Sequence, residues 1–325
     1  NPVSVSGYHI REAGSTAAQE LAFTLNNGFA YIEECLERGL KIDNFAHRLS
    51  FFFNAHMDFF EEIAKYRAAR RIWANRLKNR YGAKNESSLK LKFHTQTAGC
   101  SLTAQQPENN IVRTAFEAMS AVLGGTNSLH TNSLDETLAL PSEKAAKIAL
   151  RTQQILAFET GVPNVADPLG GSWYIEELTD KLEKQAMKYF EEIQDMGGTV
   201  QAIEDGYFQK KIAESASIYQ ESIDSKDRII VGVNDFVEED EELDIEILKI
   251  SKDAQNTQEN KIKNLRKDRN DEILNKKMKK LSDACKKDLN LVPFLIEVAE
   301  AGGTVGEIVE IMKKVYGEWE ESFGI

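Results

Sequence analysis

The chain has 325 residues, of which 42% are hydrophobic and 28% charged, a composition typical of soluble globular proteins and a length that permits a large buried core. Its 40 Lys and Arg residues are outnumbered by 52 Asp and Glu residues, and the net charge of −12 has the wrong sign for binding the phosphate backbone of nucleic acid. No segment approaches the ~18 consecutive apolar residues that a membrane span needs. We therefore expect no nucleic-acid partner and no membrane insertion.

The cysteines and the N-terminus indicate where the protein works. Cys35, Cys100 and Cys285 lie far apart in the sequence and form no C-x-x-C pair, which favours reduced thiols in an intracellular compartment. The first residues, Asn1 and Pro2, carry neither an initiator Met nor the basic and apolar regions of a signal peptide. We expect a cytoplasmic protein whose chain begins inside a longer one.

The first part of the chain repeats one pattern four times: a short β-branched or aromatic run, a polar cluster, and a long segment with helical periodicity. The predicted strands cover residues 3–9, 49–55, 89–94 and 128–130. The predicted helices cover residues 16–38, a segment that ends near residue 81, and residues 109–123 and 141–159, with Pro141 in the first turn of the last one. Parallel strands joined by helices close most often into a (β/α)₈ barrel. We therefore expect an α/β fold in which residues 1–160 supply half of such a TIM-type barrel.

Residues 161–325 are predicted to form a helical extension that wraps the barrel. Two helices are expected between residues 172 and 219, separated at Gly197 and Gly198. Residues 229–233 are rich in β-branched side chains and are expected to form one late strand.

Two charged blocks of opposite sign lie in this extension. Residues 235–246 contain eight acidic groups and no basic group, and residues 261–280 contain nine Lys or Arg against three acids. Such complementary blocks usually form a solvent-exposed helical segment with many charged side chains, which we predict at about residues 235–285. The alternative is an arm that binds another protein. The chain is expected to end in two short helices separated by Gly302 and Gly303.

Three of the five histidines, His9, His94 and His130, fall at the ends of predicted strands, the edge at which βα barrels carry their active sites. Each of them has an alternative structural role, a hydrogen bond to a loop carbonyl. A His₃ zinc site is a further alternative, but no H-x-H or H-E-x-x-H pair supports it, and we expect no metal. The lack of a G-x-S-x-G elbow argues against nucleophilic hydrolysis. His47 and His56 are expected to be structural.

Polar loops follow the third and fourth predicted strands. Residues 96–100 (QTAGC) and 131–136 (TNSLDE) are rich in small and polar side chains, which suit hydrogen bonds to the hydroxyls and ring nitrogens of a sizeable organic cofactor. Gly99 would permit close contact with its backbone. The residues by themselves identify the cofactor no further.

Four motifs in these same stretches closely resemble the large subunits of the methylmalonyl-CoA mutase family and its acyl-CoA mutase relatives. They are residues 6–14 (SGYHIREAG), 94–99 (HTQTAG), 109–115 (NNIVRTA) and 129–136 (LHTNSLDE). The likeness continues through residues 165–172 (VADPLGGS) to nearly the C-terminus. It therefore covers essentially the whole chain.

The resemblance implies an adenosylcobalamin-dependent radical isomerase that interconverts methylmalonyl-CoA and succinyl-CoA by 1,2-migration of the thioester carbonyl group. By the same resemblance, His9 is the catalytic residue, which donates a hydrogen bond to the migrating carbonyl. Tyr8 is its neighbour in the substrate site. Arg48, Leu49 and Ser50 would contact coenzyme A, with Arg48 as a clamp on a phosphate or carbonyl. A solvated surface arginine is the alternative for Arg48.

The resemblance also implies which residues hold the cofactor. Gln96 and Gly99 after the third strand, and Asn132, Glu136 and Ala139 after the fourth, match positions that line the corrin face and the adenosyl ribose. Glu136 would accept hydrogen bonds from the ribose hydroxyls. Its alternative is an acid in the first turn of a helix, where the macrodipole favours a negative charge.

Two parts of the family pattern are missing from this sequence. The family barrel has eight strands and this chain matches the last four, so the implied partners are an N-terminal barrel half, the acyl-CoA substrate and, for assembly, a GTPase chaperone. A cobalamin-binding domain or small subunit is also implied, because residues 43–47 (DNFAH) do not fit its Asp-x-His-x-x-Gly motif. A lone half barrel would expose sheet edges and an apolar face, which predicts association or aggregation.

The acyl substrate stays open, because the residues that hold the acyl end in the family lie outside this chain. Isobutyryl-CoA mutase and 2-hydroxyisobutyryl-CoA mutase are the alternatives with the same chemistry. A non-catalytic barrel half that serves subunit assembly is the alternative from another class. In a eukaryote the resemblance implies the mitochondrial matrix in place of the cytoplasm.

Overall fold

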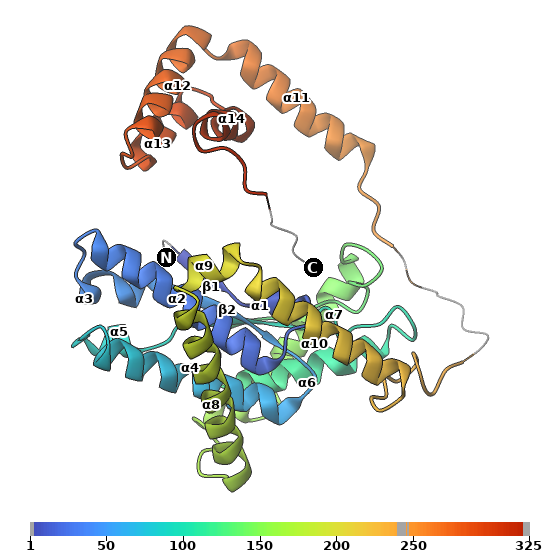
Figure 1. The fold of residues 1–325 in the computed structure, drawn as a ribbon. Coiled ribbons are helices and arrows are strands. Elements are labelled where there is room, and N and C mark those ends of the chain that lie inside the picture. Colours follow the sequence, from blue (N-terminus) through green and yellow to red (C-terminus); the bar gives the residue numbers. More distant parts are fainter. Residues whose placement is uncertain (1–2, 239–244, 246, 321–325) are drawn as a thin grey trace. The chain divides into compact units, whose positions relative to one another are not determined.

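The computed structural model of the chain describes residues 3–238, 245 and 247–320 and divides into two compact units (Figure 1). Unit 1 runs from the N-terminus to Leu248, and unit 2 begins at Lys249. The strands of unit 1 are β1 (Val3–Ser6), β2 (Leu49–Ala55), β3 (Phe93–Thr97) and β4 (Ser128–His130). Its helices are α1 (Tyr8–Glu12), α2 (Ala17–Glu37), α3 (Ile42–Phe45), α4 (Phe59–Asn79), α5 (Glu86–Leu89), α6 (Asn109–Leu123), α7 (Glu143–Phe158), α8 (Trp173–Asp195), α9 (Thr199–Glu204) and α10 (Tyr207–Asp224), with 3₁₀ turns η1 (Ala46–Arg48) and η2 (Val162–Asn164).

The four strands of unit 1 form one parallel sheet in the order β1-β2-β3-β4. The register puts Ser6 beside Phe52, Phe52 beside His94, and His94 beside Ser128, so these residues form one row across the sheet. Helices connect each strand to the next parallel strand. An α/β fold of this kind is consistent with part of a (β/α)₈ barrel.

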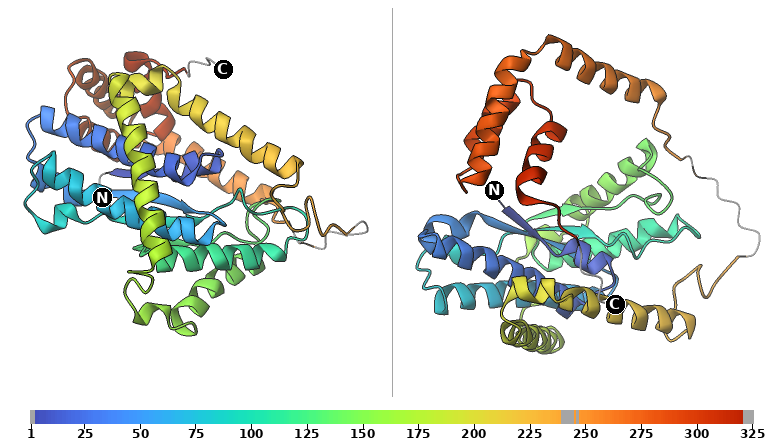
Figure 2. Two further views of the ribbon diagram at one scale, coloured as in Figure 1. Left: turned by 60° about the horizontal axis from the view of Figure 1, so that its bottom comes forward. Right: turned by 45° about the horizontal axis from the view of Figure 1, so that its top comes forward.

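One face of the sheet is buried under helices α2, α4 and α6, and α8 crosses α2 and α4 as an outer layer (Figure 2). Phe51 and Phe53 of β2 and Phe93 of β3 are almost completely buried in this core. Trp73 of α4 packs edge-on against Phe51 with ring centroids 5.0 Å apart, and Tyr66 of the same helix stacks on Phe93 at 5.2 Å. Aromatic contacts thus fix the orientation of α4 on the sheet.

The opposite face of the sheet carries a different set of side chains, and we call it the open face. Alternation along the strands brings to it the polar and aromatic residues Ser4, Ser6, Ser50, Phe52, His94, Gln96, Ser128 and His130. All of them are exposed or half-buried, whereas Asn54 on the same face of β2 is buried, as are the residues that alternate with this set on β2 and β3. A (β/α)₈ barrel points this face toward its axis.

The prediction of a first strand over residues 3–9 is wrong at its end. β1 stops at Ser6, and Tyr8 begins the short helix α1. The residue between them, Gly7, lies against α2: a Cβ at this position would stand 1.9 Å from Oγ1 of Thr24. The close approach of α2 therefore requires glycine where the chain leaves the sheet.

We expect Gly7→Ala to lower the free energy of unfolding by about 1–3 kcal/mol, the usual cost of overpacking a core, because the added methyl group would collide with Thr24. Equilibrium unfolding in urea measures this change. Thr24→Ala removes the colliding oxygen, so the double variant should be more stable than the sum of the two single effects. Additive effects would show that Gly7 is not pressed against α2.

The third strand also differs from its predicted bounds, residues 89–94. β3 begins at Phe93, and Leu89 ends the short helix α5. Asn85 caps that helix by accepting a hydrogen bond from the N–H two residues further on, at 3.0 Å. The alternating pattern therefore spans a helix end, a connector and the start of a strand. Because β3 starts later than predicted, His94 lies inside this strand. The prediction that His94 lies at the end of its strand is therefore wrong.

Most other predicted elements of unit 1 are confirmed. β2, β4 and the helix at residues 109–123 have the predicted bounds, and α2 lies within the predicted range 16–38. The prediction for Pro141 is wrong, because Ser142 is the N-cap of α7 and Pro141 precedes it. Between residues 172 and 219 the structure has α8, α9 and α10 in place of the two expected helices.

The prediction of a late strand at residues 229–233 is wrong. Val231 forms one isolated bridge, and the segment is otherwise a turn. Asn234 explains the difference: its Oδ1 accepts a hydrogen bond from the N–H of Ile230 at 2.7 Å, and its Nδ2 donates to the carbonyl of Arg228 at 2.8 Å. The asparagine side chain thus occupies backbone groups that a strand would use.

The described residues of unit 2 form the helices α11 (Lys252–Asp268), α12 (Asp271–Lys286), α13 (Val292–Glu300) and α14 (Val305–Tyr316). Its small core contains Leu274, Leu281, Cys285 and Val298. α13 and α14 confirm the two short helices predicted at the end of the chain. The basic block at residues 261–280 lies on α11 and α12, whereas most of the acidic block at residues 235–246 lies outside the described residues.

None of the helices in the described ranges is long and apolar enough to cross a membrane. The predicted division at residue 160, between barrel and wrapping extension, refers to a closed barrel and stays a prediction.

Candidate functional site

Side chains at the ends of three strands, or just beyond them, meet at the carboxyl edge of the sheet. Gln96, which was predicted in the loop after the third strand, lies within β3. Gln96 in β3 donates from Nε2 to the hydroxyl of Tyr8 at 3.0 Å and to Oδ1 of Asn132 at 2.9 Å. Asn132 is bound to β3 in turn, because its N–H donates to Oγ1 of Thr97 and its Nδ2 donates to the Thr97 carbonyl, both at 2.9 Å. Tyr8, Gln96 and Asn132, which the sequence predicted as site residues, therefore form one hydrogen-bonded chain.

Tyr8 holds this hydrogen-bonded group of three residues on the open face of the sheet. Its ring stacks on Phe52 with centroids 4.9 Å apart and an angle of 12° between the planes. Burial and the nearby carboxylate of Glu12 raise the pKa of the Tyr8 phenol, so the hydroxyl stays protonated. A neutral hydroxyl can accept from Gln96 and still donate to a ligand.

His9 lies beside Tyr8 in α1, and its side chain is exposed. The two rings meet edge to face with centroids 5.7 Å apart. Nδ1 of His9 is 3.0 Å from Oγ of Ser6, the last residue of β1. When the Ser6 hydroxyl donates in this bond, the imidazole carries its proton on Nε2 and offers a donor to a ligand.

The turn after β3, residues 98–100, brings Gly99 into the same group. A Cβ built on Gly99 would lie 3.2 Å from Oε2 of Glu12 and 3.4 Å from Nδ2 of Asn132. It would also lie 3.6 Å from Oε1 of Glu136. Two carboxylates and an amide therefore lie so close to Gly99 that a side chain at this position would press on them.

Glu136 and Ala139 belong to the loop after β4. Burial and the charge of Glu12 raise the pKa of Glu136, which biases this carboxyl group toward its neutral form. Ala139 is half-buried, and its N–H donates to the carbonyl of Asp135 at 3.0 Å. The loop thus presents Glu136 toward Gly99 and uses Ala139 in its own backbone hydrogen bonding.

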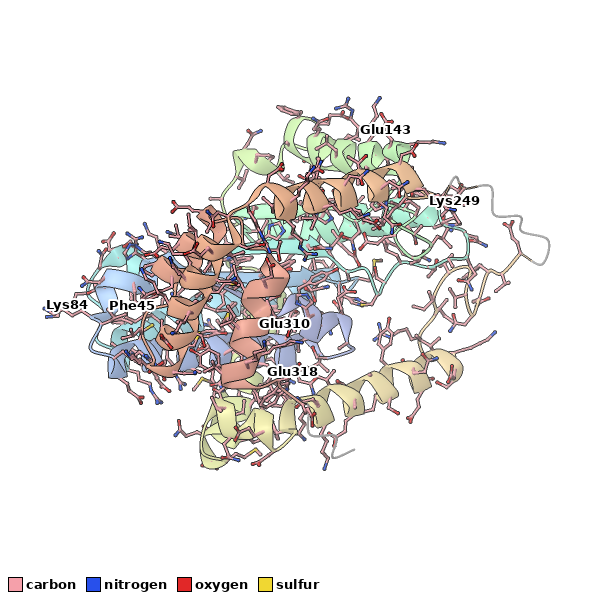
Figure 3. The ribbon with its side chains drawn as sticks, turned by 90° about the horizontal axis from the view of Figure 1, so that it is seen from above. Phe45, Lys84, Glu143, Lys249, Glu310 and Glu318 are labelled. Atoms are coloured by element: carbon pink, nitrogen blue, oxygen red, sulfur yellow. The ribbon has the colours of Figure 1, made fainter. Side chains whose placement is uncertain are left out.

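Arg48, Leu49 and Ser50 lie at the opposite edge of the sheet, where β2 begins. Figure 3 shows Phe45 and Lys84 together at this end of unit 1. Arg48 is exposed and Ser50 lies on the open face, while Leu49 is only 7% exposed and packs in the core under the helices. The length of β2 therefore separates the predicted coenzyme A contacts from the predicted cofactor residues.

The other two predicted histidines lie on the open face. Nδ1 of His94 is 2.7 Å from Oγ of Ser128, and the His94 ring is 5.0 Å from the ring of Phe52. His130 ends β4. Burial lowers the pKa of both His94 and His130, which favours neutral rings. In the part of the chain that the structure describes, no three His, Cys, Asp or Glu side chains are grouped to hold a metal ion.

Sequence reasoning missed Phe52, Asn54 and Glu12 as parts of the site. Phe52 supports the ring of Tyr8, and Nδ2 of Asn54 donates to Oε1 of Glu12 at 2.6 Å. A signal for them was present, because strict alternation in β2 puts Ser50, Phe52 and Asn54 on the same face of the sheet. Glu12 follows Tyr8 by four residues, a spacing that puts both on one side of a helix.

Comparisons with known proteins identify the family of the chain. The family model described as Methylmalonyl-CoA mutase matches residues 1–318. The chain is 46% identical to the 2-hydroxyisobutanoyl-CoA mutase large subunit of Aquincola tertiaricarbonis, over 99% of this chain and 58% of that protein. It is also 46% identical to the methylmalonyl-CoA mutase of Rhizobium meliloti (strain 1021), over 98% of this chain and 45% of the relative. The identity to the human mitochondrial methylmalonyl-CoA mutase is 46% as well, over 98% of this chain and 42% of the relative. The chain spans about half the length of these curated relatives, and it belongs to the methylmalonyl-CoA mutase family.

Proposed function

We propose that this chain is the C-terminal half of the substrate-binding (β/α)₈ barrel of an adenosylcobalamin-dependent mutase, and that the complete enzyme interconverts methylmalonyl-CoA and succinyl-CoA. Its relatives are acyl-CoA mutases, which are isomerases. The single observation that carries the proposal is the group of Gln96, Gly99, Asn132 and Glu136 at the carboxyl edge of the open face. Barrel enzymes carry their catalytic groups at that edge.

Adenosylcobalamin, when bound, supplies a radical through cleavage of its cobalt–carbon bond. In the proposed site Glu136 accepts hydrogen bonds from the ribose hydroxyls. Gln96 and Asn132, which bond to each other at 2.9 Å, line the neighbouring wall. Gly99 has no side chain to press on Glu12, Asn132 and Glu136, so these three residues would keep their positions around the cofactor. These residues orient the cofactor and exclude water from it.

His9 is the proposed donor to the thioester carbonyl oxygen while this group migrates. The contact between its Nδ1 and the Ser6 hydroxyl, at 3.0 Å, orients the ring, and in the tautomer in which Ser6 donates, Nε2 carries the proton to be donated. Because negative charge develops on the oxygen during migration, a fixed donor stabilises the transition state more than the bound substrate. Tyr8 packs against the imidazole and limits its motion.

The proposed substrate path follows β2 along the open face. Arg48 and Ser50 lie at the amino edge and His9 at the carboxyl edge, so an extended thioester lies along the strand direction. Arg48 is the clamp for a phosphate or carbonyl of coenzyme A, since its guanidinium is exposed and offers several donors. Leu49 contributes its backbone, because its side chain is buried in the core.

The barrel is proposed to close with strands from outside residues 3–320. β1 and β4 are the two edge strands of the sheet, and each would pair with one such strand. The name of one relative, a large subunit, implies a partner subunit for that protein. We infer that this chain works with an N-terminal barrel half and with a cobalamin-binding domain or small subunit.

A 2-hydroxyisobutyryl-CoA mutase is the second candidate. It is favoured by the relative from Aquincola tertiaricarbonis, which is as similar to this chain as the methylmalonyl-CoA mutases are and of which this chain covers 58%.

The test is a mutase assay of the complete enzyme, assembled with its cobalamin-binding partner and supplied with adenosylcobalamin. Methylmalonyl-CoA, isobutyryl-CoA and 2-hydroxyisobutyryl-CoA are offered separately, and the thioester products are separated by chromatography. We expect methylmalonyl-CoA to yield succinyl-CoA. A preference for 2-hydroxyisobutyryl-CoA would favour the second candidate. An assembled protein that binds no adenosylcobalamin and rearranges none of the thioesters would support a non-catalytic barrel half instead.

A further inference from the structure

The carboxylate of Glu12 joins three elements at the candidate site. Its Oε1 accepts hydrogen bonds from Nδ2 of Asn54 at 2.6 Å and from the N–H of Gly99 at 2.9 Å. Its Oε2 accepts a hydrogen bond from the N–H of Cys100 at 2.9 Å. Hydrogen bonds to a charged acceptor are about twice as strong as neutral ones. One side chain thus binds α1 to β2 and to the turn after β3.

The Asn54 side of this arrangement is fixed in the core. The N–H of Asn54 donates to Oε1 of Glu20 at 2.7 Å, and its carbonyl accepts from Nζ of Lys65 at 2.8 Å. The hydroxyl of Tyr66 donates to the same carbonyl. All four residues are completely buried. Glu12 is therefore bound to a rigid partner.

The other side is the turn at residues 98–100. The N–H of Ala98 still belongs to the sheet, because it donates to the carbonyl of Ala55 at 2.8 Å. The next two N–H groups, of Gly99 and Cys100, point away from that ladder and donate to Glu12. Glu12 therefore takes over as the acceptor at the point where the sheet ends.

We propose that Glu12 is a positioning residue of the mutase site, which holds the turn at residues 98–100 in the conformation that puts Gly99 beside Glu136 at the cofactor. This role rests on the proposed function, because it is exerted toward adenosylcobalamin. Glu12 acts through the backbone of the turn, and it need not touch the ligand itself.

Glu12 also acts on Glu136 through its charge. Oxygen atoms of the two carboxyl groups lie 3.2 Å and 3.6 Å from the position of a Cβ on Gly99. Burial and the charge of Glu12 raise the pKa of Glu136, the charge of Asp135 raises it further, and a hydrogen bond with the backbone of Ser133 opposes the rise. An ionised Glu136 offers acceptors to both ribose hydroxyls, whereas its neutral form gives up part of that capacity. Cofactor affinity should therefore increase as the pH rises through the pKa of Glu136, and removal of the Glu12 charge should move this increase to lower pH.

The test compares Glu12→Gln with the parent in the complete, assembled enzyme. Glutamine keeps the size of the side chain but turns one acceptor oxygen into an amide NH₂, which would face a backbone N–H of the turn. We expect adenosylcobalamin to bind about 10–100-fold more weakly, the effect of losing a hydrogen bond to a charged group. The pH at which the affinity increases should also move downward. Absorbance titration with adenosylcobalamin at several pH values measures both effects.

A second readout is independent of the cofactor. Amide hydrogen exchange at Gly99 and Cys100 should become at least about tenfold faster in Glu12→Gln, because the acceptor that protects these groups is weakened. Exchange at Ala98 should not change, because its N–H bonds to the sheet. Glu12→Asp keeps the charge but is shorter, so it should weaken binding without moving the pH at which the affinity increases.

The matched control is Glu61→Gln on α4, which removes the charge of another acid whose ion pair is with Arg11 at 3.8 Å. It should leave cofactor affinity and exchange at the turn unchanged. Unchanged affinity and exchange in Glu12→Gln would overturn the role of Glu12 and leave the proposed function intact. A parent enzyme that binds no adenosylcobalamin would overturn the role toward the cofactor together with the proposed function, and exchange at Gly99 would still decide whether Glu12 holds the turn.

Discussion

Replacement of His9 by alanine is expected to lower the turnover of the assembled mutase by about 10²–10³-fold, the usual effect of removing one donor to a developing oxyanion. The His9 side chain is exposed and its Nδ1 contacts the half-buried Ser6, so its truncation leaves no buried group without a partner. The fold should therefore survive. Because the donor acts mainly in the transition state, the loss should appear in kcat more than in KM, as measured by steady-state kinetics with the thioester substrate.

Two further variants distinguish the effect of the His9 imidazole from that of the Ser6 hydroxyl that orients it. Ser6→Ala keeps the imidazole but removes the hydroxyl at 3.0 Å from Nδ1, and it should lower kcat by about tenfold, the smaller effect typical of an orienting partner. His47→Ala is the matched control, because His47 lies in η1 at the other end of β2. It should leave kcat nearly unchanged. Normal turnover in His9→Ala would contradict the assigned donor and favour a barrel half without catalytic groups.

The bounds of a strand could be predicted where the local sequence pattern sets them. The predictions were wrong where a tertiary contact decides at which residue the strand ends. The run at residues 49–55 combines alternation with aromatic side chains, and β2 has the predicted bounds. Tyr8 and His9 continue the same kind of local pattern after β1, yet they lie in a helix. The turn between them and β1 depends on how closely Thr24 of α2 approaches Gly7, which no local pattern contains.

The sequence predicted that the site residues lie at the carboxyl edge of the sheet. It did not predict the hydrogen bonds between them. The rule that parallel strands end at a common edge brings Tyr8, Gln96 and Asn132 together, and the structure joins them by two hydrogen bonds. The same rule cannot reveal a side chain whose partners are backbone groups. The sequence does not reveal the role of Glu12, because two of its three hydrogen-bond donors are the main-chain N–H groups of Gly99 and Cys100.

Substitution of Lys65 by methionine is expected to destabilise the chain by about 3–5 kcal/mol, the cost of breaking a buried ion pair. Lys65 of α4 is completely buried, and its ammonium lies 2.5 Å from Oε2 of Glu20 and also bonds to Glu62. Arg11 of α1 pairs with Glu62 at 3.4 Å, so two acids and two bases balance one another. This network lies behind Asn54 and thus beneath the residues that support the candidate site.

The loss in Lys65→Met should depend on pH. Burial raises the pKa of Glu20 to about 7, against the opposing effect of the Lys65 ammonium. Burial acts to raise the pKa of Glu62 as well, but the charges of Lys65 and Arg11 outweigh it and hold that pKa below its usual range. Without Lys65 both values rise. A carboxyl group whose folded pKa exceeds its unfolded pKa loses stabilisation as the pH rises between the two values. The variant should therefore be weakest above about pH 7 and should recover part of its stability as the pH falls toward about 5.

Urea unfolding of the full chain at both pH values measures this dependence, and two comparisons identify its cause. Lys78→Met changes an exposed lysine of the same helix and should alter the free energy of unfolding by less than about 0.5 kcal/mol at either pH. Adding Glu20→Gln to Lys65→Met removes the carboxylate that has lost its cation, while Glu62 keeps its pair with Arg11 at 3.4 Å. This double variant should regain stability at neutral pH and lose much of the pH dependence. If Lys65→Met is destabilised equally at both pH values, the loss comes from the packing of the lysine stem, and the charges of Glu20 and Glu62 are compensated without it.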